Sequence, residues 1–147
     1  MPVTIARIAE DDATYAWDLV ACTSELEHWR AIAAGAVGRL GGDRDAVALT
    51  RLGVTELISN VIKHVAHDPR CRLVVTCESD RDVRISVCDR SLRVPKLTVP
   101  DWSSESGRGL WLLCEMAPAW GCTRLDGGKS VWFRFPLACG DGETARR

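Results

Sequence analysis

The sequence predicts an α+β two-layer sandwich, in which helices cover one face of a mixed, mainly antiparallel sheet. Apolar residues recur at helical spacing between residues 24 and 67, and after Pro69 they alternate with polar ones as in β-strands. The order strand, helix, helix, hairpin, loop, helix, hairpin keeps the helices apart from an antiparallel sheet. We therefore expect a single domain over residues 1–140 and a flexible tail over residues 141–147.

The chain is predicted to begin with one strand and one helix. Residues 3–8 alternate as an edge strand, and the acidic residues 10–12 follow as a turn. Thr23 or Ser24 is the expected N-cap of the helix, because their hydroxyl groups can accept from the free N–H groups of a first turn. The helix is expected to run to about Leu40, where a pair of glycines stops it.

A second, longer helix is predicted directly after these glycines. Asp43 is its expected N-cap, and an Asp-Pro pair is expected to end it near His67. One broad side of this helix is apolar and can pack on the sheet. The opposite side carries a strip of four polar residues at spacings of four, three and one: Glu56, Asn60, Lys63 and His64.

The second half of the chain is predicted to consist of two hairpins separated by a loop and a helix. Alternation over residues 73–87 with a polar turn gives the first hairpin. Residues 92–106 have little periodicity, and a loop of about 15 residues is long enough to suggest a function. A helix over residues 110–116 follows, and residues 120–125 and 131–137 form the second hairpin around a glycine-rich turn.

Composition limits the classes of function. The chain has 147 residues, 46% of them hydrophobic, with 19 basic and 20 acidic side chains. A net charge of −1 excludes a strong global attraction to nucleic acid or to an anionic membrane. The chain has neither an apolar run long enough to span a bilayer nor a signal peptide, so we expect it to be cytoplasmic. The seven scattered cysteines are expected to be reduced, buried thiols.

Two further segments could form a ligand site together with the polar strip of the second helix. The apolar strand over residues 83–88 ends in Asp89, whose carboxylate could accept a hydrogen bond from an exocyclic amine. Gly107 and Gly109 precede a predicted helix, where the backbone can approach a ligand closely and free N–H groups favour an anion such as phosphate. Taken singly, a polar helix face, a strand-terminal aspartate and a pair of glycines are each common in proteins without a ligand.

In this order, ELISNVIKH at 56–64, the strand to Asp89, the loop, GRGL at 107–110 and GGKSVWFRF at 127–135 resemble the ATP-binding superfamily of gyrase B, histidine kinases and mismatch-repair ATPases. The closest likeness is to the small anti-sigma-factor serine kinases of bacteria. The resemblance covers residues 20–137 and implies the Bergerat-type, histidine-kinase-like ATPase fold.

The resemblance assigns a role to each of the motif residues. It implies that Asn60 coordinates Mg²⁺, that Glu56 is the general base, and that Asp89 recognises the adenine amine. Lys63 and His64 would contact phosphate or close the pocket. The remaining nucleotide-binding positions implied by the resemblance are Ser91, Gly107, Arg108, Gly109, Leu110 and Ser130. Magnesium prefers oxygen ligands and keeps several waters, so one amide oxygen from the protein suffices.

The chain departs from the family pattern just after the aspartate. The family has glycine at the second and fourth positions that follow it, and here these positions hold Ser91 and Arg93. Because glycine lets this segment approach the base with few steric limits, its loss is expected to weaken nucleotide binding.

Two hypotheses of different classes follow. In the first, the protein sequesters a sigma factor and phosphorylates a serine of an antagonist protein with Mg-ATP. In the second, it is a non-catalytic protein-protein interaction module in which nucleotide binds weakly or structurally. The catalytic half of a histidine kinase is disfavoured, because His28 lies on the only helix before the Glu56 helix. Direct binding to nucleic acid is not expected, and a homodimer is a reasonable expectation.

Overall fold

The computed structural model describes residues 3–7, 13–65, 67–78, 81–92 and 115–137. Its elements, in chain order, are β1 (Val3–Arg7), β2 (Ala13–Val20), the 3-10 turn η1 (Thr23–Glu25), α1 (Leu26–Arg39), α2 (Arg44–His64), β3 (Arg70–Cys77), β4 (Asp82–Asp89), β5 (Ala119–Leu125) and β6 (Gly128–Pro136).

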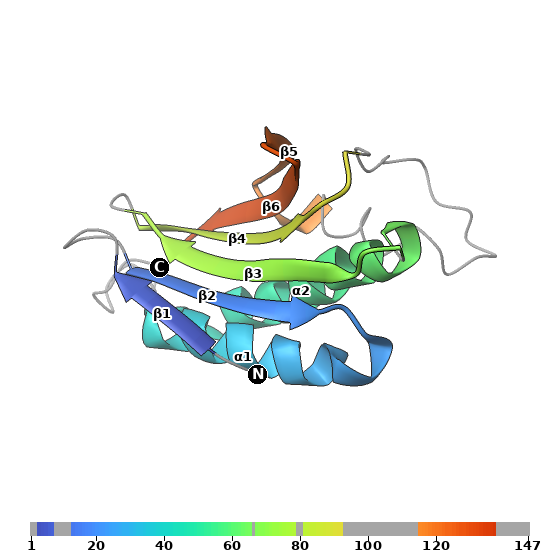
Figure 1. Cartoon of the computed structure of the whole chain (residues 1–147). Helices are drawn as coiled ribbons and strands as arrows, with labels where there is room; N and C mark the ends of the chain where they lie inside the picture. The colour runs from blue at the N-terminus through green and yellow to red at the C-terminus, as the bar shows by residue number, and fades with distance from the viewer. Residues whose placement is uncertain (1–2, 8–12, 66, 79–80, 93–114, 138–147) are drawn as a thin grey trace, which may run out of the picture.

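The six described strands form one sheet in the order β1-β2-β3-β4-β6-β5, and each described pairing is antiparallel. Both helices lie on the same face of this sheet (Figure 1). The predicted α+β sandwich with helices on one face is therefore confirmed.

The core lies between the helices and the inner face of the sheet. Trp29 of α1, Leu57 and Ile58 of α2, and Phe133 of β6 are almost fully buried there. Gly53 lies in the middle of α2, where a Cβ atom would collide with the ring of Phe133. This glycine allows α2 to approach β6 closely, and the close approach fixes where the rest of α2 lies on the sheet.

A short connection joins the C-terminal end of α2 to the start of β3, an inner strand of the sheet. The helix ends at His64 and β3 begins at Arg70. The carbonyl of Pro69, within this connection, accepts a hydrogen bond of 2.8 Å from the amide of Ala21. Because β3 begins where β4 ends, the C-terminal end of α2 lies at the same end of the strands as Asp89, the last residue of β4 (Figure 1).

The N-terminal half differs from the sequence prediction in three respects. The strand β2 was not predicted, because its alanines hide the inward alternation of Tyr15, Trp17 and Leu19. The cap at Thr23 or Ser24 was wrong: these residues lie in η1, and α1 begins at Leu26 without a side-chain cap. The second helix ends at His64 rather than near His67.

Other boundaries agree with the sequence. Gly41 has a φ of +100°, which ends α1 as its glycine predicted, and the Asp43 side chain accepts from the Ala46 amide as the N-cap of α2. Both hairpins form. The predicted loop beyond Leu92, the predicted helix before Glu115, and the predicted tail lie outside the described residues.

The described cysteines are free thiols, as expected. Only part of the expectation of burial holds, because Cys22 is exposed while Cys71 is buried. Burial, reinforced by the negative charge of Asp89, raises the pKa of the Cys71 thiol to about 12. That thiol therefore stays protonated and unreactive at neutral pH.

Candidate functional site

The polar strip predicted on the second helix is present on the last turns of α2. The prediction that it lies opposite the side packed on the sheet was wrong, because Asn60 shares the side of Gly53, which packs on Phe133. Glu56 and Asn60 are partly buried, whereas Lys63 and His64 are exposed. A residue of a helix lies above the one four positions before it, so Glu56 and Asn60 are neighbours on one side of α2. The inner half of the strip therefore carries a carboxylate and an amide, and the outer half carries the basic residues.

Glu56 is held in an environment that disfavours its charge. Burial of its carboxyl raises the pKa of Glu56 above 4.5, and the positive charge of Lys63 partly opposes this rise. A carboxylate with a raised pKa is a stronger base, which suits proton transfer.

The side chain of Asn60 has a nitrogen atom that no described residue uses. Its Nδ2 atom is buried and has no hydrogen-bond partner in the part of the chain that the structure describes. An unpaired buried N–H costs about 1–3 kcal/mol, so such groups are uncommon in folded proteins and call for an explanation. A ligand that reaches this amide would explain it.

Asp89 ends β4 on the inner face of the sheet. It continues the buried row of Val83, Ile85 and Val87, and only 8% of its surface is exposed. The backbone amide of Ser91 donates a hydrogen bond of 2.8 Å to its Oδ1 atom, and Ser91 is itself buried.

The sequence analysis missed the residue that pairs with Asp89. Lys129 stands opposite Asp89 in the β4–β6 register, and its Nζ atom lies 2.9 Å from Oδ1 and 3.0 Å from Oδ2. Only 7% of Lys129 is exposed. The signal was its position: Lys129 shares the parity of the inward residues Val131 and Phe133, although we had assigned it to the turn.

The structure does not bring Ser130 to Asp89. In β6 the buried residues alternate, and Ser130 lies between Lys129 and Val131 on the other face of the sheet. The resemblance implied that a hydroxyl group lies beside the base. In the structure Lys129, not Ser130, is the residue next to Asp89. Residues 107–110, the predicted phosphate-cradling turn, lie outside the described residues.

The fold brings the strip on α2 and the end of β4 together. Asn60 lies seven residues after Gly53, hence on the same side of α2 and about 10 Å further along the helix axis. Lys129 lies four residues from Phe133 on the same face of β6, about 13 Å along the strand. From the contact of Gly53 with Phe133, the segment to Asn60 and the segment to Lys129 both run toward the end of the sheet at which β4 ends.

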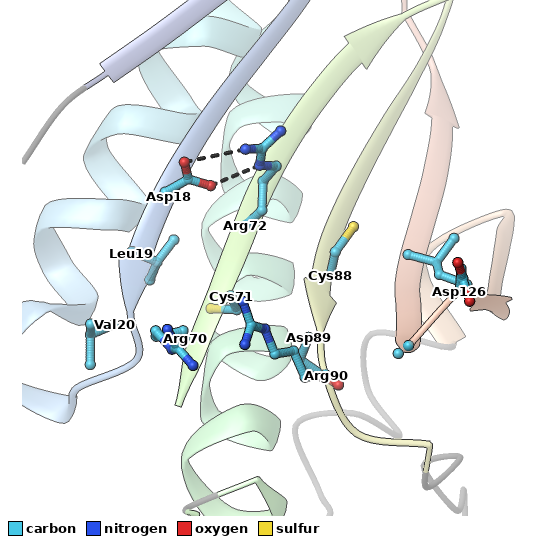
Figure 2. Close-up of a pocket in the computed structure, with 13 residues that line it drawn as sticks. Asp18, Leu19, Val20, Arg70, Cys71, Arg72, Cys88, Asp89, Arg90 and Asp126 are labelled. Atoms are coloured by element: carbon cyan, nitrogen blue, oxygen red, sulfur yellow. Dashed lines mark hydrogen bonds and ion pairs between the residues drawn. The ribbon is translucent and has the colours of Figure 1, made fainter. Parts of the chain in front are cut away.

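A hollow of about 870 Å³ lies across β2, β3, β4 and the β5–β6 turn. In Figure 2 the helices lie behind the sheet, and the side chains of Asp18 and Arg72 form an ion pair of 2.8 Å on the opposite, open face. Among the residues that line this hollow, Asp89 is the only one that the sequence analysis singled out. Its arginines are already paired, Arg72 with Asp18 and both Arg70 and Arg90 with Asp68, so we place the candidate site on the inner face instead.

Comparison with known families identifies a domain that spans most of the chain. Residues 19–135 match the histidine kinase-like ATPase domain. The chain belongs to this family. The matched segment of the ATPase domain includes α2, Asp89 and Lys129 and covers most of the chain. A comparison with curated protein sequences finds no match.

A solved structure supports the fold of the ATPase domain. The chain is similar to the crystal structure of the RsbU and RsbW domains of Rv1364c from Mycobacterium tuberculosis, with a TM-score of 0.61 and 18% sequence identity. The similarity covers 84% of this chain and 32% of that one, so this chain spans about a third of the length of its structural neighbour. At this identity the likeness concerns the fold alone.

The family implies a nucleotide, with magnesium as its usual companion, and the residues on α2 fit such a group. Asn60 supplies an amide and Glu56 a carboxyl group, and hard cations such as Mg²⁺ prefer oxygen ligands of these kinds. The Nδ2 atom of Asn60 has no hydrogen-bond partner among the described residues, so its N–H groups are available to a phosphate oxygen.

No helix among the described residues is long and apolar enough to cross a membrane.

Proposed function

We propose that the ATPase domain binds ATP with magnesium on the inner face of the sheet and uses it to phosphorylate a serine of a partner protein. The observation that carries this proposal is the pair on α2: Asn60, whose buried Nδ2 has no described acceptor and could donate to a phosphate oxygen, and, one turn before it, a carboxyl group at Glu56 whose pKa is raised by burial. The C-terminal end of α2 lies at the end of the sheet where β4 ends, which supports base and phosphate recognition within one site.

In this proposal the chain's own residues divide the work. Asn60 holds the magnesium through its amide oxygen, and Asp89 faces the nucleobase. Glu56 accepts the proton of the attacking serine hydroxyl, and Lys63 and His64 stand at the exposed end of the strip near the phosphates. Bound magnesium supplies neutralisation of phosphate charge, which is the main requirement of phosphoryl transfer.

The neighbouring RsbW domain suggests the biological setting. We propose that the partners are a sigma factor, which the protein sequesters, and an antagonist protein that carries the serine. The likeness of fold and the shared family support this, and the candidate general base at Glu56 supports kinase activity over simple binding.

Calorimetric titration of ATP and ADP with magnesium tests nucleotide binding directly. We expect Asn60→Ala to lower the affinity for Mg-ATP at least about 50-fold, because the proposed amide ligand of the cation is lost. Ser59→Ala, at the neighbouring position of α2, is the matched control and should bind as the unaltered protein does. Equal affinity in Asn60→Ala and the control would exclude Asn60 as the magnesium ligand.

Transfer of labelled phosphate from ATP to candidate antagonist proteins tests the kinase activity. Glu56→Gln should bind ATP but lower the transfer rate at least about 100-fold, within the usual range for loss of a general base.

A non-catalytic interaction module is the second candidate, and the occupied carboxylate of Asp89 favours it. In that case capture of a sigma factor would be unchanged by Asn60→Ala and by removal of ATP.

A further inference from the structure

A side chain of the protein already occupies the base end of the site. The ammonium of Lys129 donates to both oxygens of Asp89, at 2.9 and 3.0 Å, and the Ser91 amide donates to Oδ1 at 2.8 Å. The two side chains of the pair are 8% and 3% exposed, so water hardly competes for them. Asp89 is therefore not a free acceptor waiting for a ligand.

The ammonium is a stronger partner for Asp89 than a nucleobase amine would be. A hydrogen bond between two charged groups is about twice as strong as one between neutral groups, and the low local dielectric strengthens it further. A neutral exocyclic amine offers only a neutral donor. A nucleotide that places its base at Asp89 has to take a position that Lys129 holds.

The side chain of Lys129 can move away from Asp89 without breaking the pairing of β6 with β4. It is the second residue of β6, next to the turn at Asp126 and Gly127, which are exposed. The lysine side chain has a flexible four-carbon stem, so its charged head can move toward solvent while the backbone stays paired. Gly128, by contrast, is fixed, since a Cβ atom there would collide with the backbone of Asp89.

We propose that Lys129 occupies the base subsite of the nucleotide-free protein, that nucleotide binding displaces its ammonium from Asp89, and that Lys129 thereby sets the affinity for ATP. This inference rests on the proposed function, since it takes Asp89 as the base-recognising residue. The phosphate end of the site, at Asn60, then drives binding, and the base contributes little net affinity in the unaltered protein.

Titration of Lys129→Met with ATP and magnesium tests the proposal. Methionine keeps a long unbranched side chain but has no ammonium. We expect the Kd for ATP to fall at least tenfold relative to the unaltered protein, whereas the affinity for tripolyphosphate, which has no base, stays within threefold. Arg124→Met is the matched control: it removes one exposed positive charge from the same hairpin, opposite Lys129, and should leave both affinities unchanged.

Each result of the titration is decisive. An ATP affinity that is unchanged or lower in Lys129→Met overturns the inference, as does an equal gain for tripolyphosphate, while binding by the unaltered protein leaves the proposed function standing. If the folded protein and the folded variant both fail to bind ATP, the proposed function itself fails, and the inference with it. Binding by the variant alone supports both.

Lys129→Met leaves a buried carboxylate unpaired and therefore costs stability. A second measurement avoids this difficulty because it uses the unaltered protein. The chain has three lysines, Lys63, Lys96 and Lys129, so acylation of each amine can be followed by mass spectrometry. We expect Lys129 to be protected without nucleotide and to react at least fivefold faster with saturating Mg-ATP, relative to the α-amino group. Continued protection of Lys129 in the ATP complex would overturn the inference.

Discussion

The polar strip on α2 and the end of β4 differ in whether their buried polar groups have hydrogen-bond partners. On α2, the Nδ2 atom of Asn60 is buried without a partner among the described residues, and burial raises the pKa of Glu56. At the end of β4, Asp89 has hydrogen bonds to both carboxylate oxygens, from Lys129 and Ser91. One end of the site is thus prepared for a ligand at a cost in stability, while the other is satisfied by the protein itself.

The difference teaches where the binding energy of a ligand would come from. An unpaired buried N–H costs about 1–3 kcal/mol, which a ligand at α2 recovers if it accepts a hydrogen bond from Nδ2 of Asn60. A ligand at Asp89 recovers nothing of this kind, because it has to replace a bond that already exists. The three predictions that follow test this contrast, from the largest expected effect to the smallest.

Loss of Lys129 should have the largest effect on stability. We expect Lys129→Met to lower the free energy of unfolding by about 3–5 kcal/mol, because it leaves the buried carboxylate of Asp89 without its charged partner. Urea denaturation measures this. Replacing both members, Asp89→Leu with Lys129→Met, should restore most of the loss, since neither charge is then buried alone.

The exposed ion pair of Asp18 and Arg72 is the control for this prediction. Its N–O distance of 2.8 Å is as short as that of the buried pair, but its side chains are 59% and 55% exposed. Arg72→Met should therefore cost less than about 1 kcal/mol. Similar losses for Lys129→Met and Arg72→Met would mean that the Asp89–Lys129 pair is not buried in solution.

A methyl group at Gly53 should separate the two regions. Gly53→Ala places a Cβ atom against the ring of Phe133, so α2 must move away from β6, and we expect a loss of about 1–3 kcal/mol in urea denaturation. The same substitution at Gly38 of α1, which has open space around it, should stabilise by up to about 1 kcal/mol through helix propensity. A stabilising Gly53→Ala would contradict the close packing of α2 on the sheet.

Neutralising Glu56 should have the smallest effect, and its sign depends on pH. Burial raises the pKa of Glu56 in the folded state, so the ionised carboxylate costs stability, and this cost appears as the pH rises through the folded pKa. Glu56→Gln removes the cost, and we expect its Tm at pH 7 to be about 1–2 °C higher, a modest gain because the group is only half-buried.

The gain of Glu56→Gln should vanish when the pH falls below 4.5, where Glu56 is protonated in both folded and unfolded protein. Thermal unfolding followed across pH measures the difference. Glu115→Gln, at an exposed carboxylate, is the control. A gain that is the same at pH 4 and pH 7 would show that desolvation of the carboxylate is not its cause.

Much of the fold could be predicted from periodicity. The cap at Asp43, the two hairpins and the long amphipathic helix each had a local signal, and each is present. The strand β2 was missed because its alanines favour neither period clearly, and its pairing with β3 is a contact between segments far apart in the chain. Propensity is local, whereas strand pairing depends on what another part of the chain offers.

For the candidate site, too, the local spacing of residues could be predicted from the sequence, whereas contacts between distant segments could not. The spacing of Glu56 and Asn60 placed them on one side of a helix, and the structure agrees. The choice of Ser130 over Lys129 followed the family pattern and ignored the parity of β6, which places Lys129 inward and Ser130 outward.

The sequence by itself determined the helix and strand periods, the polar strip of α2, and a strand that ends in Asp89, because these depend on neighbours within a few residues. Only the tertiary structure decided that Lys129 pairs with Asp89, 40 residues away, and that the Nδ2 atom of Asn60 is buried without a partner in the described part of the chain. Burial and pairing are properties of surfaces that meet in space, and a hydrogen-bond partner can be supplied by any segment that the fold brings near. The sequence gives the chemical groups of the site; packing decides which of them remain free to bind a ligand.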